Sequence, residues 1–212
     1  MLTDYMTKYI TERGIGFIQF NKRITSISQL DTTGMKVSVR GESLPRTYSH
    51  VISSIPLPGL RTINLSGAGL SVMQSTALRK LQYGPLVKIG MRFKSAWWTE
   101  KFGIVGGQSY TDLPIRTIVY PSYGVDSSTP STVLIASYCW TNDAERLGSL
   151  INTGKAEYTD QLKDLVLCNL AEVHNLTYDF LLSQCEDMHA WDWGHDPLAI
   201  GEVVSNRKPT VA

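Results

Sequence analysis

The side chains best suited to metal chemistry gather near the C-terminal end of the chain. His189 and His195 lie close to Asp192 and Asp196 in the sequence, and imidazole and carboxylate groups are common ligands of transition metals. Trp191 and Trp193 lie among them. This density of indole rings favours a packed aromatic patch over an ion site, so the sequence predicts no metal centre.

The other chemistry-bearing residues are equally restrictive. The 3 cysteines, Cys139, Cys168 and Cys185, are odd in number and have no C-x-x-C spacing. This pattern favours three small buried hydrophobes over a disulfide framework or a zinc knuckle. The sequence also contains no G-x-G-x-x-G, P-loop, G-x-S-x-G or H-E-x-x-H motif. Isolated motifs therefore assign no function to the chain.

Composition excludes further classes. The chain has 212 residues, 42% of them hydrophobic, and a formal net charge of +1. This length suits one large domain or two small ones, and the balanced charge argues against a nucleic-acid partner. No apolar run is long enough to span a membrane. The N-terminal residues lack the pattern of a signal peptide, and the cellular compartment is left open.

Hydrophobic periodicity predicts the elements of the N-terminal part. An apolar stripe at helical spacing over residues 2–10 predicts a helix that packs on the core. Strand-like runs follow at 16–20, 23–30, 35–40 and 49–55, with a hairpin loop at 31–34. A helix is expected over 70–81, with Ser71 as its N-cap and the face of Leu70, Met73, Ala77, Leu78 and Leu81 buried.

The rest of the chain alternates strands with helices. Strands are expected at 86–93, 103–106, 115–120 and 132–140. A long helix is expected from about 155 to 173, with Leu162, Val166 and Leu170 among its inward residues, and a shorter helix, capped by Thr177, at 178–185. Hairpins mixed with helices predict an α+β or mixed α/β fold, rather than a bundle or a sandwich.

Four segments, in one order and register, resemble the flavin-dependent amine oxidases, in particular their L-amino-acid oxidase branch. The most specific segment is Gly106-Gly-Gln-Ser-Tyr-Thr-Asp-Leu-Pro-Ile-Arg116, which is followed by Tyr120-Pro-Ser122. The other three segments cover residues 20–57, 78–98 and 135–144, the last of these together with 193–201. Within the most specific segment, Asp112 and Arg116 are interpreted as structural, ordering their loop through a charge-assisted hydrogen bond.

The resemblance implies a division of the chain. Residues 1–83 would form part of an FAD-binding domain with a β-hairpin or meander. Residues 84–201 would form a substrate-binding domain with a mixed β-sheet flanked by helices. Residues 202–212 match nothing in the family pattern. Because the family's G-x-G-x-x-G loop is absent, the expectation is an interior fragment whose binding of FAD is lost or very weak.

The resemblance also assigns roles to single residues. Lys88 matches the lysine that holds a water near flavin N5, and a desolvated ammonium can orient or deprotonate such a water. The alternative is a surface lysine on an edge strand. Tyr138 matches a tyrosine whose hydroxyl binds the substrate carboxylate, and Trp140 would line the side-chain pocket. Trp193 matches an aromatic residue that packs near the flavin ring.

Three further residues are assigned to the cofactor by the same resemblance. Ile24 matches the position whose backbone meets the adenine end of FAD, a role that does not depend on its side chain. Ser54 and Pro56 would lie near the cofactor.

The expected function is that of a fragment of an FAD-dependent L-amino-acid oxidase, inactive alone. The intact parent would convert an L-amino acid to a 2-oxo acid, ammonia and hydrogen peroxide. One alternative is a fragment of a monoamine or polyamine oxidase. Another is a non-catalytic binding or assembly module, because exposed sheet edges and helix faces favour association with a second copy or a complementary chain.

Overall fold

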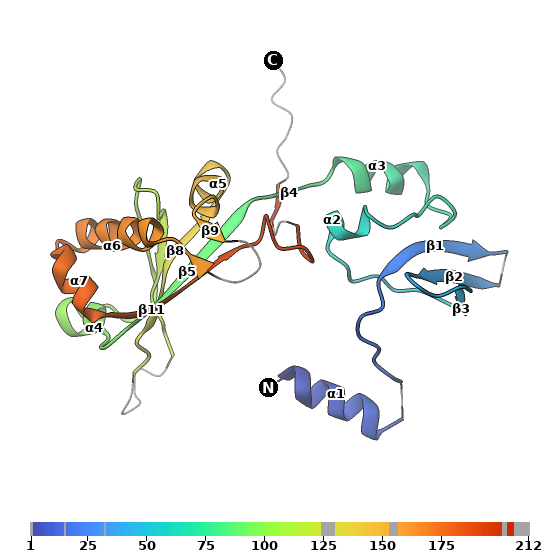
Figure 1. The fold of residues 1–212 in the computed structure, drawn as a ribbon, viewed down its shortest axis with the longest axis horizontal. Coiled ribbons are helices and arrows are strands. Elements are labelled where there is room, and N and C mark those ends of the chain that lie inside the picture. Colours follow the sequence, from blue (N-terminus) through green and yellow to red (C-terminus); the bar gives the residue numbers. More distant parts are fainter. Residues whose placement is uncertain are drawn as a thin grey trace, which may run out of the picture. The chain divides into compact units, whose positions relative to one another are not determined.

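The computed structural model describes residues 2–14, 16–31, 33–123, 130–152, 157–200 and 203–205. The chain forms two compact units. The first unit comprises Met1–Ile55 and Leu60–Leu78, and the second comprises Pro56–Gly59 and Arg79–Ala212. Figure 1 shows both units, each of which is described by itself below. Their assignment to cofactor and substrate binding stays a prediction.

The first unit begins with helix α1, Leu2–Glu12, which the sequence periodicity located correctly. Its apolar stripe does not pack on a core: Leu2 is 75% exposed and Tyr5 69% exposed. Periodicity defines an apolar face but does not identify the surface that covers it. The expectation that this stripe is buried is therefore wrong for the described chain.

A three-stranded antiparallel meander follows, in the order β1-β2-β3. Its strands are β1 (Ile24–Leu30), β2 (Gly34–Val39) and β3 (Arg46–Tyr48). Ile27, Val37 and Val39 are its buried hydrophobic residues. The outer edge of β1 is covered, since Gln29 N–H donates to the Gly67 carbonyl at 2.7 Å and Asn64 N–H donates to the Thr25 carbonyl at 2.9 Å.

Two expected strands of this region are absent from the described structure. Residues 16–20 and 49–55 are irregular, and Ile52, in an apolar run that resembles a buried strand, is 96% exposed. Hydrophobic composition alone does not provide a neighbouring strand for pairing. The two short helices that follow are α2 (Leu57–Leu60) and α3 (Val72–Lys80).

Helix α3 begins with a reciprocal pair of capping bonds. Gln74 N–H donates to Ser71 Oγ at 3.2 Å, and Ser71 N–H donates to Gln74 Oε1 at 2.8 Å. This is a capping box, and it confirms Ser71 as the N-cap. The face expected to be buried is not, because Met73 is 81% exposed and none of the helix residues is buried.

The second unit is built on a five-stranded sheet in the order β11-β5-β8-β7-β6. Its strands are β5 (Leu86–Phe93), β6 (Gln108–Tyr110), β7 (Thr117–Val119), β8 (Val133–Trp140) and β11 (Cys185–Asp192). Two small antiparallel pairs join β4 (Gln82–Gly84) to β12 (Val203–Ser205) and β9 (Ile151–Asn152) to β10 (Glu157–Tyr158).

The α+β class is confirmed, with one correction to the sheet. The sheet of the second unit was expected to be mixed, but its described pairings are all antiparallel. The strand expected at 103–106 is irregular, and β11 was not expected as a strand. The tail 202–212 contributes β12, and its other residues lie outside the described part of the chain.

Four helices complete the second unit: α4 (Trp97–Phe102), α5 (Asn142–Gly148), α6 (Asp160–His174) and α7 (Tyr178–Gln184). Leu162, Val166 and Leu170 of α6 are fully buried, as expected. The helix begins at Asp160, where the Thr159 side chain accepts a hydrogen bond from Leu162 N–H. Residues 155–156 of the expected start lie outside the described residues, and residues 157–158, which were expected to be helical, form β10. Thr177 caps α7 by accepting from Phe180 N–H at 3.3 Å.

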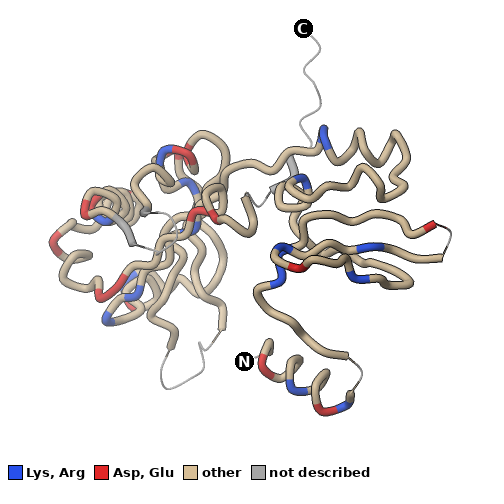
Figure 2. Tube along the Cα trace, turned by 45° about the vertical axis from the view of Figure 1, so that its right-hand side comes forward, with Lys and Arg blue, Asp and Glu red and all other residues tan. Residues whose placement is uncertain are grey.

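Strand β5 shows why the sheet has two different faces. Val87, Ile89, Met91 and Phe93 alternate along it and are buried in one hydrophobic cluster with residues of α4, α5, α6 and α7. Because side chains alternate across a strand, Lys88 and Gly90 belong to the opposite face. We call the first the covered face and the second the open face. In the second unit, basic and acidic residues are interspersed along the chain (Figure 2).

The 3 cysteines occupy three different environments. Cys139 is buried, Cys185 is partly buried and Cys168 is exposed, and all are free thiols. The expectation of three buried hydrophobes is therefore wrong for Cys168. Its helix α6 directs Leu167 and Leu170 inward, and the helical repeat turns Cys168, the residue after Leu167, toward solvent.

A buried polar chain lies at the C-terminal end of α6. The Nδ1 of His174 lies 2.8 Å from the Leu170 carbonyl, and its Nε2 lies 2.6 Å from Tyr120 Oη. Tyr120 Oη in turn lies 3.0 Å from Ser109 Oγ. Because a carbonyl only accepts, Nδ1 carries the proton and the neutral imidazole satisfies both of its nitrogens.

We expect this histidine to make the fold less stable in acid. Burial lowers the pKa of His174 below its ordinary value. The unfolded chain therefore binds a proton near pH 6.5 that the folded chain does not, and the free energy of unfolding falls as the pH drops below that value. Urea unfolding at about pH 7.5 and about pH 5 measures the fall.

The matched variant is His174→Gln, which does not titrate. It should be less stable than the parent at neutral pH, and it should lose less stability between the two pH values. As a control, His189→Gln alters an exposed side chain and should retain the full fall. An equal fall in the parent and in His174→Gln would contradict the assignment.

Candidate active site

The open face brings together two residues to which the sequence resemblance assigned roles. Lys88 of β5 is directly paired with Tyr138 of β8. The Lys88 Nζ lies over the Tyr138 ring, 4.8 Å from its centroid, a cation–π geometry. Both side chains are half-buried. Strand β5, which carries Lys88, has β11 on one side and β8 on the other. This excludes the alternative of a surface lysine on an edge strand.

Trp140 extends this cluster along β8. It lies two residues after Tyr138 and so on the same face, and the two rings pack edge to face with centroids 5.6 Å apart. Trp140 is 49% exposed. An exposed indole beside a tyrosine is suited to contacting an apolar ligand group while the hydroxyl contacts a polar one.

The structure adds a residue that the sequence reasoning missed. Trp191 of β11 is paired with Lys88 on the side opposite Tyr138. Its ring stacks on His189 at 6.0 Å and meets Trp193 edge to face at 6.1 Å. The period-two spacing of these three aromatic rings is the strand signal that would have placed them on one face.

Two indole donors of this patch fit a bound polar group. Nε1 of Trp191 and Nε1 of Trp193 are buried and have no hydrogen-bond partner within the described residues. An unsatisfied buried donor costs free energy, so acceptor atoms of a ligand placed there would be stabilised. Trp193 is held in place by its backbone N–H, which donates to the Leu86 carbonyl at 2.9 Å.

The acidic residues of this segment organise the loop. The Asp192 carboxylate lies 2.6 Å from His195 Nδ1 and accepts from Gly194 N–H at 2.7 Å. Asp196 Oδ1 accepts from the backbone N–H groups of Leu198 and Ala199. Among the residues that the structure describes, no group of three or more potential metal ligands is found.

The cofactor residues of the first unit lie in two settings. Ile24 lines a pocket of about 470 Å³ together with Phe17, Lys22, Val39 and Arg46. This volume is in the range of small-molecule sites. Ser54 and Pro56 lie in an irregular, exposed segment. Ile24 and Ser54 belong to the first unit, whereas Pro56, Lys88, Tyr138, Trp140 and Trp193 belong to the second.

The pocket in the first unit carries an ion-pair cluster. Glu42 accepts from Lys22 Nζ at 2.8 Å and from two nitrogens of Arg46. These hydrogen bonds, that of Arg46 first, lower the pKa of Glu42 to about 2. The cluster joins the segment before β1 to the segment around β3.

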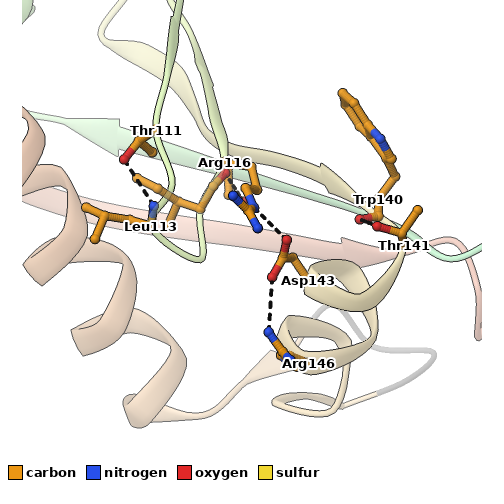
Figure 3. A network of polar contacts seen from close by, with 9 residues as sticks. Thr111, Leu113, Arg116, Trp140, Thr141, Asp143 and Arg146 are labelled. Carbon is orange, nitrogen blue, oxygen red and sulfur yellow. Dashed lines mark hydrogen bonds and ion pairs between the residues drawn. The ribbon is translucent and has the colours of Figure 1, made fainter.

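The most specific sequence segment has a partner that was not expected. Arg116 Nε donates to the Asp143 carboxylate at 2.5 Å, and Arg146 of α5 lies 3.4 Å from the other Asp143 oxygen (Figure 3). Arg116 was expected to order its own loop with Asp112. The charge-assisted bond instead connects that loop to the first turn of α5.

Comparison with known proteins agrees with this architecture. A sequence model described as "Flavin containing amine oxidoreductase" matches residues 1–211. The chain is 52% identical to L-amino-acid oxidase 4 of Hebeloma cylindrosporum over 212 residues, which is 95% of the chain and 34% of that protein. It is 36% identical to an L-amino-acid oxidase of Mus musculus, over 69% of the chain and 21% of the mouse protein.

Solved structures show the same fold. Cyclohexylamine oxidase from Brevibacterium oxydans superposes with a TM-score of 0.68 at 15% identity, covering 92% of the chain and 39% of that enzyme. An engineered putrescine oxidase gives a TM-score of 0.68 at 14% identity, over 91% of the chain and 39% of that enzyme.

The chain belongs to the flavin-containing amine oxidoreductase family, a family of FAD-dependent proteins. It spans about a third of the length of the L-amino-acid oxidase 4 that it matches. Among the described residues, none of the helices is long and apolar enough to cross a membrane.

Proposed function

We propose that the chain provides the substrate-facing part of an FAD-dependent L-amino-acid oxidase, and that it is inactive without a complementary nucleotide-binding part. The observation that carries the proposal is the Lys88–Tyr138 pair on the open face, with Nζ 4.8 Å from the ring centroid. The reaction would convert an L-amino acid, dioxygen and water to a 2-oxo acid, ammonia and hydrogen peroxide, with dioxygen as the final oxidant. Bound FAD would supply the redox chemistry by accepting a hydride from the substrate α-carbon.

In this proposal the ammonium of Lys88 holds and orients a water molecule. The cross-strand contact with Tyr138 restricts the lysine side chain, and strands on both sides of β5 fix its backbone. Such positioning lowers the entropic cost of bringing a water to one place. Because Lys88 faces away from the hydrophobic core, its Nζ remains within reach of a ligand on the open face.

Tyr138 and Trp140 would divide the recognition of the amino acid between them. The Tyr138 hydroxyl would donate a hydrogen bond to the substrate α-carboxylate, and the Trp140 ring would contact the side chain. Their edge-to-face packing makes the two contacts interdependent. A carboxylate contact of this kind distinguishes amino acids from simple amines. It therefore favours an L-amino-acid oxidase over a monoamine or polyamine oxidase.

Cofactor contacts are proposed for single residues of each unit. We assign Ile24, Ser54 and Pro56 to cofactor contacts, and Trp193 to the edge of the flavin ring. The buried indole donors of Trp191 and Trp193 support a polar ligand on the open face, and the pocket at Ile24 supports a ligand in the first unit. Residues 203–205 add β12 beside β4, and the proposal assigns them no role in cofactor binding.

A chimaera tests the proposal. The matched third of Hebeloma L-amino-acid oxidase 4 is replaced by this chain, and the purified protein is assayed for bound flavin and for peroxide release. We expect FAD binding and turnover of L-amino acids, with D-amino acids and simple amines as negative controls. The 212-residue chain alone should release no peroxide.

Three outcomes would count against this function. Turnover of amines but not of amino acids would support the monoamine or polyamine oxidase. A folded chimaera that binds no FAD would support a non-catalytic assembly module. Turnover by the isolated chain would contradict its dependence on a complementary part.

A further inference from the structure

The turn that ends β8 is held in an unfavourable backbone conformation. Thr141, the residue after Trp140, has a φ of 61°, a region that residues with a Cβ rarely adopt. Its N–H donates to the Pro85 carbonyl at 3.2 Å, and its hydroxyl donates to the Trp140 carbonyl at 2.6 Å. The Thr141 side chain does not cap α5, so the turn lacks the usual capping bond of a helix start.

The loop that contains Arg116, just before β7, is also held in an unfavourable backbone conformation. Arg116 has a φ of 56°. Its N–H donates to the Leu113 carbonyl at 3.0 Å, and its carbonyl accepts from Thr111 N–H at 2.9 Å. Strain of this kind persists only where the surroundings fix it. The Arg116 side chain joins the two constrained segments by its bond to Asp143, two residues after Thr141.

The ion pair between Arg116 and Asp143 compensates the charge of a carboxylate that is largely buried. The Asp143 side chain is only 13% exposed, whereas the side chains of Arg116 and Arg146 are 45% and 77% exposed. Arg146 lies on the same helix as Asp143, so the ion pair between these two residues does not connect α5 to another element. Without Arg116, the carboxylate would keep the longer 3.4 Å contact with Arg146, and the ion pair between the loop and the helix would be lost.

We propose that Arg116 is a positioning residue, and that its ion pair with Asp143 fixes the end of β8 and so the orientation of Trp140 in the substrate pocket. The Trp140 ring points away from the ion pair (Figure 3), so Arg116 acts through the backbone and does not contact substrate. This inference rests on the proposed function for the role of Trp140. The indole of Trp140 is 49% exposed, so the backbone turn that follows it contributes to fixing its orientation.

A pocket beneath the ion pair provides a readout that needs no activity. It has a volume of about 330 Å³, and its lining includes Arg116, Cys139, Trp140, Thr141 and Asp143. Cys139 is fully buried, and burial raises the pKa of its thiol to about 11. It should therefore react slowly with a thiol reagent until the loop at Arg116 moves. Cys168, which is exposed, reports full reactivity in the same sample.

The experiment compares Arg116→Ala, Arg116→Lys and Arg146→Ala in the whole chain. Peptide mass spectrometry follows iodoacetamide labelling of Cys139 at about pH 8, a condition in which local opening limits access to a buried group. We expect labelling to rise about tenfold or more in Arg116→Ala, because local openings are governed by the contacts that hold them closed. Arg116→Lys should be intermediate and Arg146→Ala should match the parent.

A second measurement follows Trp140 directly. Its near-ultraviolet circular dichroism is obtained by subtracting the spectrum of the Trp140→Phe version of each protein. Arg116→Ala should lose the band from the Tyr138–Trp140 pair while retaining a cooperative thermal transition. A general loss of structure would abolish the cooperative transition as well. In the FAD-loaded chimaera carrying Arg116→Ala, KM for large L-amino acids should rise about tenfold with a smaller change in kcat, as for a displaced positioning group.

The outcomes separate this inference from the proposed function. If the chimaera with the Hebeloma oxidase lacks L-amino-acid turnover, the proposed function fails, while labelling and the Trp140 band in the 212-residue chain still decide whether Arg116 fixes the strand end. Equal labelling and equal Trp140 spectra in Arg116→Ala and Arg146→Ala would overturn the inference.

Discussion

Replacing Lys88 with methionine should lower kcat of the FAD-loaded chimaera with the Hebeloma oxidase about 10²–10⁴-fold, the range for loss of a group that moves or orients a proton. Methionine has a similar length and no charge, so the open face keeps its packing while the ammonium is lost. The Tyr138 ring loses its cation, but the strand pairings on both sides of β5 remain. Stopped-flow reduction of the flavin under anaerobic conditions isolates the step from reoxidation.

Lys101→Met provides a matched control. The Lys101 Nζ lies 4.7 Å from the centroid of the Phe180 ring, so it makes the same type of contact away from the open face. This variant should retain the parent kcat. If both lysine variants lost activity equally, the effect would come from the general loss of a cation–π contact, and Lys88 would have no special role.

Truncating Trp97 to alanine should produce the largest loss of stability, about 3–5 kcal/mol in the free energy of unfolding. Trp97 is fully buried. Its ring packs edge to face against Phe93 of β5 at 5.6 Å and against His174 of α6 at 4.9 Å. The indole therefore joins the sheet to the helix that covers it, and alanine leaves a cavity that neither element can fill.

Urea unfolding followed by far-ultraviolet circular dichroism measures this loss. Trp140→Ala removes the same number of atoms from a half-exposed site and should cost much less, because most of its surface meets solvent already. A loss of under about 1 kcal/mol for Trp97→Ala, typical of surface substitutions, would contradict the described core.

The core of the second unit was predictable because its patterns are local. The alternation along β5, the inward positions Leu162, Val166 and Leu170, and the cap at Thr177 follow from periodicity and hydrogen-bond chemistry. These rules need no knowledge of the partner. The α+β class follows from the same elements.

The errors share a physical cause, which is that exposure depends on the surroundings of an element. The stripe of α1 and the run at Ile52 have the residue types of buried segments, yet both are exposed in the first unit. Strand β11 was missed because its aromatic and acidic residues were interpreted together as one patch. Alternation assigns Trp191 to the open face, while Asp192 on the other face is buried.

The candidate site was proposed from family resemblance, because a lysine between valine and isoleucine has no intrinsic signature. Geometry then supplied what the resemblance could not. It gave the Lys88–Tyr138 contact and the Trp191 neighbour. It also corrected the partner of Arg116 from Asp112 to Asp143, which is distant in sequence and close only after folding.

The alternation of β5 has a consequence for changes in chain length. Deleting or inserting a single residue near its start would move the ammonium of Lys88 to the covered face and turn a core side chain to the open face. One such change would then separate Lys88 from Tyr138 and bury a charge at the same time. A substitution in this strand changes one side chain, whereas an insertion or deletion changes the face of every side chain beyond it, so recombination or design in this sheet has to exchange β11, β5 and β8 together.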